Sequence, residues 1–205
     1  MDTREWALLV FTILGQIAAG LMIVLMVVRT YVARKTNVEL ADQLTERPLY
    51  LVVPVMAVAF IASLLHLGSP LNILRAIPNL GSSWLSREVV IAVIFVVFAG
   101  LYAFMQWRKV GNEALRTVIG WVAAVLAVVF VYSMSMVYMI ATQPAWNTFA
   151  TPLTFLSGSL MLGGLGMAAA LLFGDAGKKE KDLVYKVLQG LGVTAIVLLG
   201  IQFVV

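Results

Sequence analysis

Hydrophobic residues fall into six runs along the chain, and each run is long enough to form a membrane-spanning helix. We expect spans at 6–28, 49–67, 89–106, 117–141, 152–173 and 183–205. A helix of roughly 20 apolar residues crosses the hydrocarbon core of a bilayer. The polar stretch at 29–47 is interpreted as the first loop. The pattern therefore predicts an all-α integral membrane protein, a bundle of six transmembrane helices that forms one domain over 1–205.

Composition supports a membrane protein and excludes several kinds of metal site. The sequence is 62% hydrophobic and 12% charged, whereas soluble domains are about half apolar and about a quarter charged. It contains no cysteine, so it cannot form a disulfide or a cysteine-ligated zinc or iron–sulfur site. Its single histidine cannot make a bis-histidine haem site alone. We expect this protein to bind no metal and no haem, and no nucleic acid.

Lysine and arginine are unevenly divided between the two sides of the predicted bundle. Most of the 14 basic residues lie in the first, third and fifth loops or in their flanks. Basic residues in short loops concentrate on the cytoplasmic side of a membrane. This bias predicts that the N-terminus, the second loop and the fourth loop face outside.

The second loop, HLGSPLNILRAIPNLGSSWLSRE, combines ionisable, aromatic and turn-forming residues at one membrane edge. It includes His66, Arg75, Trp84, Arg87 and Glu88. His66 ends the second predicted span and Glu88 precedes the third, so both residues are expected at similar depth in neighbouring helices. Oxidation of a quinol releases protons, and an imidazole beside a carboxylate can accept and relay them. The loop is therefore a candidate site for a lipid-soluble redox carrier, with Arg75 or Arg87 as electrostatic support.

A structural interpretation of the same residues is also open. His66 could cap a helix by bonding loop carbonyls, while Arg87 and Glu88 form an interfacial ion pair. Glu88 itself is expected at the start of the third helix, where the helix dipole favours a carboxylate in the first turn. Ionisable groups beside membrane spans favour a function without establishing one.

The fourth loop is uncharged and is a candidate docking surface. TQPAWNTFAT, at 142–151, includes Pro144, Trp146 and Asn147. Aromatic and amide side chains suit a protein interface, and a protein without metal ligands must pass electrons to a partner. The alternative is an ordinary turn with Trp146 in the aromatic belt at the membrane surface.

Two segments resemble a known family. LLHLGSPLNILRAIPNLGSSWLSREV, at 64–89, and YMIATQPAWNTFATPLTF, at 138–155, are similar to the membrane anchor subunit of bacterial dimethyl sulfoxide reductases. The resemblance implies a haem-free anchor that binds and oxidises menaquinol at the outer face of the membrane. It implies an iron–sulfur subunit as electron acceptor and a molybdenum catalytic subunit beyond it. It also implies that His66 and Glu88 serve quinol binding and oxidation.

The resemblance places the protein in the cytoplasmic membrane of a bacterium or archaeon. It also implies eight spanning helices, so the six found here predict a sequence that stops short of the family fold. Three alternatives remain: a purely structural anchor with quinol bound by another subunit, an anchor of the polysulfide-reductase type, and a secondary transporter. A transporter would place polar groups at mid-membrane, whereas the ionisable residues here lie near the ends of the spans.

Overall fold

Six helices make up most of the protein in the computed structural model, which describes residues 3–66, 79–174 and 180–204. They are α1 (Thr3–Lys35), α2 (Val38–His66), α3 (Trp84–Arg108), α4 (Glu113–Tyr138), α5 (Ala150–Phe173) and α7 (Lys181–Val204). All six are long and apolar enough to cross a membrane, and the described ranges contain no strand. The prediction of an all-α bundle of six spanning helices is confirmed.

The first two helices are longer than the spans predicted for them. The stretch at 29–47, predicted as a polar loop, is helical except at Thr36 and Asn37, which form the turn between α1 and α2. The loop prediction is wrong because charged residues in this stretch are paired inside the bundle. Arg29 and Asp42 are only 2% and 6% exposed.

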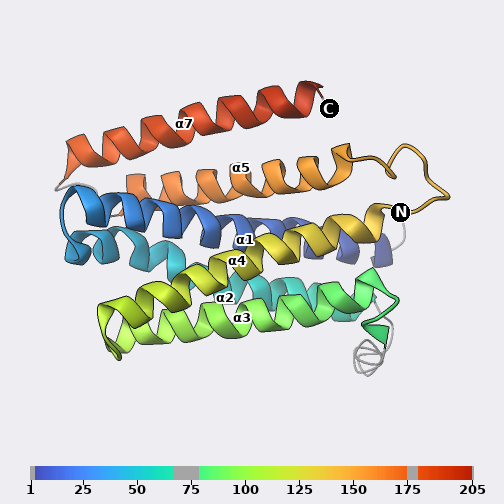
Figure 1. Cartoon of the computed structure of the whole chain (residues 1–205), viewed down its shortest axis with the longest axis horizontal. Helices are drawn as coiled ribbons and strands as arrows, with labels where there is room; N and C mark the ends of the chain where they lie inside the picture. Colours follow the sequence, from blue (N-terminus) through green and yellow to red (C-terminus); the bar gives the residue numbers. More distant parts are fainter. Residues whose placement is uncertain (1–2, 67–78, 175–179, 205) are drawn as a thin grey trace.

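The helices alternate in direction, and α1 lies at the centre of the bundle (Figure 1). It packs against α2, α4 and α5, while α3 packs mainly on α4 and α7 mainly on α5. The start of α3 and the segment that joins α4 to α5 lie at one end of the bundle, at the right of Figure 1. We call this the Trp84 end, and we call the opposite end, where α1 meets α2, the Asp42 end.

Small residues allow α1 and α5 to approach each other closely. A Cβ atom added at Gly163 would overlap the backbone of Gly20, and one added at Gly20 would overlap the carbonyl group of Ser159. The Ser159 hydroxyl also donates a hydrogen bond of 2.9 Å to the main-chain oxygen of Gln16. Small residues at helix interfaces are a common route to tight packing in membranes. This contact places α5 directly against the central helix.

A buried polar network joins four helices at the Asp42 end. Arg29 Nε donates to Asp42 Oδ1 at 2.8 Å, and Arg29 Nη1 donates to Thr117 Oγ1 at 2.9 Å. Gln106 Nε2 donates to the same Asp42 oxygen at 3.0 Å. Arg116 Nη1 donates to Gln106 Oε1 at 2.8 Å. The network therefore fixes α1, α2, α3 and α4 relative to one another.

Substitution of Gly163 should destabilise the α1–α5 contact. We expect Gly163→Ala to lower the free energy of unfolding by about 1–3 kcal/mol, the usual range for overpacking a tight interior. Gly164→Ala is the matched control, since an added Cβ there meets nothing within 4 Å. The free energy of unfolding of both variants is measured in mixed micelles titrated with a denaturing detergent, with the loss of helix followed by circular dichroism. Equal stability of the two variants would contradict the close contact.

Removal of the charge of Asp42 should destabilise the bundle far more than removal of an exposed charge. Asp42→Asn leaves Arg29 buried without its counter-ion, which typically costs about 3–5 kcal/mol. The control is Glu46→Gln, because Glu46 pairs with Lys109 and both side chains are partly exposed. We expect less than about 1 kcal/mol there. The same unfolding measurement tests both variants. A loss of less than about 1 kcal/mol in Asp42→Asn would show that the network does not stabilise the bundle.

Candidate functional site

The first turn of α3 is set by capping at Ser83. Ser83 has extended backbone angles, and its side-chain oxygen accepts a hydrogen bond from the Ser86 main-chain N–H at 3.4 Å. Serine is among the preferred residues at this position because its oxygen pairs with an otherwise free N–H of the first turn. The helix therefore begins at Trp84, five residues before the predicted span.

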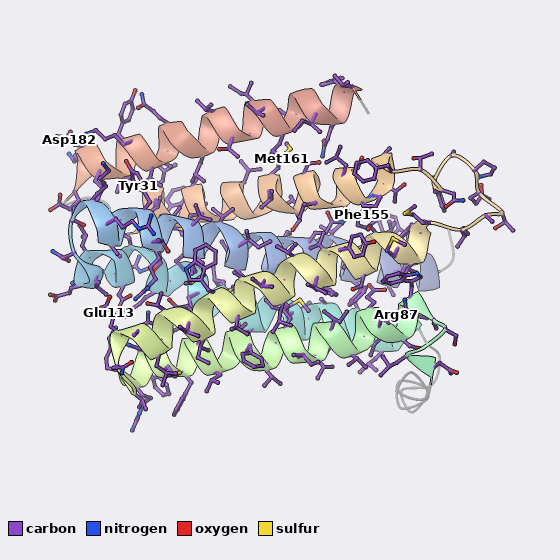
Figure 2. All side chains as sticks on the ribbon, in the orientation of Figure 1. Tyr31, Arg87, Glu113, Phe155, Met161 and Asp182 are labelled. Atoms are coloured by element: carbon purple, nitrogen blue, oxygen red, sulfur yellow. The ribbon has the colours of Figure 1, made fainter. Side chains whose placement is uncertain are left out.

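Arg87 holds the turn before α3 and stacks on a tryptophan. Its Nε donates to the Leu80 carbonyl and its Nη2 to the Gly81 carbonyl, both at 2.8 Å. Its guanidinium carbon lies 4.4 Å from the centre of the Trp84 ring. The Trp84 ring in turn meets Tyr132 of α4 edge to face, with ring centres 5.9 Å apart. This arrangement fixes Trp84 between a cation and a second aromatic ring, and Figure 2 shows Arg87 at this end of the bundle.

Glu88 lies on the inward face of α3 and is only 4% exposed. No hydrogen bond or ion pair joins it to another residue within the described ranges. The ion pair between Arg87 and Glu88 considered from the sequence does not form, because Arg87 bonds carbonyls of the preceding turn. The expected position in the first turn is also wrong, since α3 starts at Trp84 and its first turn contains no acid.

Two of the predicted site residues cannot be placed beside Glu88. His66 is the last residue of α2, but its side chain lies outside the described residues, and Arg75 lies outside them entirely. The proximity of His66 and Glu88 therefore stays a prediction. Trp84, Arg87 and Glu88 lie within about one turn of a single helix.

The predicted docking residues lie on a segment that projects beyond the helices at the Trp84 end (Figure 1). Pro144, Trp146 and Asn147 are all exposed. Trp146 is 50% exposed although its ring packs against Tyr138 at 6.1 Å. The Thr151 hydroxyl donates to the Trp146 main-chain oxygen at 2.6 Å. Trp146 is thus exposed, and it is fixed by the ring of Tyr138 at the end of α4 and by the hydroxyl of Thr151 at the start of α5.

Sequence reasoning missed Tyr132. It lies within a long apolar run, where an aromatic residue carries no separate signal, and its contact with Trp84 joins α3 and α4.

The site can accept a ligand that donates hydrogen bonds. A buried carboxylate without a partner is unfavourable, and a hydroxyl group of a ligand would supply the missing donor to Glu88. Trp84, one helical turn before Glu88, and Arg87, the residue directly before it, add an aromatic ring and a cation to this part of α3. Among the described residues, no group of three or more His, Asp or Glu side chains could hold a metal ion.

Comparisons with known proteins identify the family of this sequence. The model of a family described as DMSO reductase anchor subunit (DmsC) matches residues 1–205. The YnfH subunit of an anaerobic dimethyl sulfoxide reductase of Escherichia coli (strain K12) is 34% identical over 169 residues, which cover 82% of this protein and 58% of that one. The C subunit of the anaerobic dimethyl sulfoxide reductase of the same strain is 33% identical over 203 residues, 97% of this protein and 67% of that one.

A third relative is the C subunit of the anaerobic dimethyl sulfoxide reductase of Haemophilus influenzae. It is 28% identical over 197 residues, which cover 96% of this protein and 69% of that one. The sequence therefore spans about three fifths to two thirds of the length of these relatives. No solved structure matches it.

Proposed function

Because this protein belongs to the DMSO reductase anchor subunit family, we propose that it anchors a dimethyl sulfoxide reductase-like complex and oxidises menaquinol at the Trp84 end. Its six apolar helices make it a multi-pass bacterial membrane protein. The observation that carries the proposal is Glu88, which is only 4% exposed and makes no hydrogen bond or ion pair with a described residue. The partners proposed for it are an iron–sulfur subunit that receives the electrons and a molybdenum catalytic subunit.

Each residue of the site has a role in this proposal. Glu88 accepts a hydrogen bond and then a proton from a quinol hydroxyl group, since a base must lie within hydrogen-bond reach of the proton it takes. Arg87 and Trp84 form the surface against which the head group lies, and Arg87 keeps that surface rigid through its two carbonyl bonds. His66 is the second proton acceptor, and Arg75 adds positive charge.

The Trp84 end is proposed to face outside. The Asp42 end carries basic residues such as Arg34, Lys35 and Lys109, and basic loops concentrate on the cytoplasmic side. Protons released to Glu88 then leave on the outer side, and electrons leave to a partner bound there. Electron transfer is fast only over short distances, so the acceptor must dock over the site.

The projecting segment at 142–149 is proposed as that docking surface. It carries Trp146 and Phe149 with 50% and 81% exposure, and it has no charged residue. Exposed aromatic side chains are enriched among residues that dominate binding energy. The segment lies at the same end of the bundle as the start of α3 (Figure 1), which would bring a bound partner near Glu88.

The role of Glu88 can be tested with the whole complex in membranes. We expect Glu88→Gln to lower menaquinol-driven turnover by about 100-fold or more, because the loss of a general base typically has an effect of this size. Turnover with an artificial dye that reduces the catalytic subunit directly should be unchanged. His66→Ala should give the same pattern.

Glu113→Gln is the matched control for this experiment. Glu113 is an exposed acid at the Asp42 end (Figure 2), and its substitution should leave both activities unchanged. Normal menaquinol oxidation in Glu88→Gln would refute the site. Binding of a quinone analogue only to another subunit would favour a purely structural anchor.

The docking surface can be tested separately from quinol chemistry. We expect Trp146→Ala to weaken association with the electron-transfer subunit by at least about tenfold, as for an aromatic residue central to an interface. Affinity is measured with the purified anchor in detergent and the soluble subunits. Trp107→Ala is the control, since Trp107 is 65% exposed at the Asp42 end. A complex that stays intact and fully active in Trp146→Ala would remove the main support for docking here.

A further inference from the structure

An apolar groove runs between α4 and α5 at the Trp84 end. Its volume is about 330 Å³. Val129 and Tyr132 line it from α4, while Pro152, Leu153 and Leu156 line it from α5, and Phe149 of the connecting segment lines it as well. No charged residue lines the groove, so a ligand that fits it must be apolar.

The groove is open to the surface that the membrane surrounds. Val129 is 41% exposed and Tyr132 is 47% exposed, and both lie within a helix that is apolar enough to span the bilayer. An occupant can therefore enter from the lipid and does not need to cross water. Its volume of about 330 Å³ is at the lower end of the roughly 300–1,000 Å³ range of small-molecule pockets, so the groove suits one part of a larger molecule.

One residue connects the groove to the proposed site of quinol oxidation. Tyr132 lines the groove and contacts the Trp84 ring edge to face at 5.9 Å. Trp84 in turn lies under the guanidinium group of Arg87, one helical turn before Glu88. The polar and apolar binding surfaces are thus continuous, and Figure 2 shows Arg87 and Phe155 of α5 at the same end of the bundle.

We propose that this groove holds the first part of the isoprenoid tail of the quinol, while the head group lies against Trp84, Arg87 and Glu88. The inference rests on the proposed function, because it needs a quinol at that site. It adds the requirement that the ligand has an apolar tail attached to its ring. A phospholipid acyl tail has similar apolar chemistry, but only a tail attached to the head group would use the continuity through Tyr132.

The groove orients the quinol and contributes little to its affinity. Lipid tails are as apolar as leucine side chains, so transfer of the tail from the bilayer to the groove has no large hydrophobic driving force. The benefit is positional, since a tail held between α4 and α5 directs the ring toward α3. An effect on KM of a few-fold, confined to tailed donors, is therefore the expected result of filling the groove.

The test fills the groove and compares two donors in the complex in membranes. Val129→Trp places a large ring in the groove, and Val118→Trp is the matched control on the same helix. Val118 is 57% exposed and does not line the groove. It lies about 16 Å along the helix axis from Val129 and on the same helix face. The donors are a menaquinol with a long isoprenoid tail and a naphthoquinol without a tail.

We expect Val129→Trp to raise KM for the tailed donor by about threefold or more and to leave KM for the tail-less donor unchanged. Val118→Trp should change neither value. Unchanged kinetics with both donors in Val129→Trp would refute the proposal that the groove holds the quinol tail. The same result is expected if only membrane lipid occupies the groove. Equal loss with both donors would overturn it as well, because the effect would not depend on the tail.

The same assay separates this inference from the function on which it rests. Glu88→Gln should abolish oxidation of both donors. If it does so while Val129→Trp behaves as wild type, the site of oxidation stands and the tail groove is refuted. If Glu88→Gln oxidises both donors normally, the proposed function fails and the groove inference fails with it.

Discussion

The hydrogen bond between Gln106 and Asp42 fixes the rotation of α3, and the orientation of Glu88 depends on that rotation. Gln106 is 1% exposed and donates to Asp42, which is paired with Arg29. Positions 88 and 106 are separated by five full turns at 3.6 residues per turn, so they lie on the same helix face. A helix held inward at Gln106 must also carry Glu88 inward. The rise between them is about 27 Å, close to the thickness of the hydrocarbon core.

Helix geometry also explains why the adjacent charges of Arg87 and Glu88 do not pair. Consecutive residues on a helix point about 100° apart and do not face each other. Glu88 lies on the buried face, while Arg87 turns toward the preceding segment and bonds the carbonyls of Leu80 and Gly81. The arginine therefore supports the turn, and the Glu88 carboxylate makes no hydrogen bond or ion pair with a described residue. At the start of α3, Arg87 therefore positions the turn, while the next residue, Glu88, is the candidate proton acceptor.

The six spans were predictable because length and hydropathy decide whether a helix crosses a membrane. The extension of α1 and α2 through 29–47 could not be predicted in the same way. A hydropathy average treats Arg29 and Asp42 as exposed charges, whereas in the structure they form an ion pair across the turn. Glu88 was predicted as a site residue because an acid beside an apolar run is rare. Its position beyond the first turn of α3 could not be predicted, because the helix starts at Trp84, after the capping residue Ser83. Tyr132 was missed because its importance arises from a contact with Trp84 on another helix.

The middle of α3 separates the two polar regions of the bundle. On the inward face between Glu88 and Tyr102 lie Ala92, Phe95 and Ala99, all fully buried, and Phe95 stacks on Phe130 at 6.0 Å. These side chains offer no donor or acceptor, and proton transfer needs polar groups or ordered water. Along this face, no polar side chain connects Glu88 with the network at Asp42. The buried charged residues among those described therefore lie toward the two ends of the bundle, Arg29 and Asp42 at one end and Glu88 at the other.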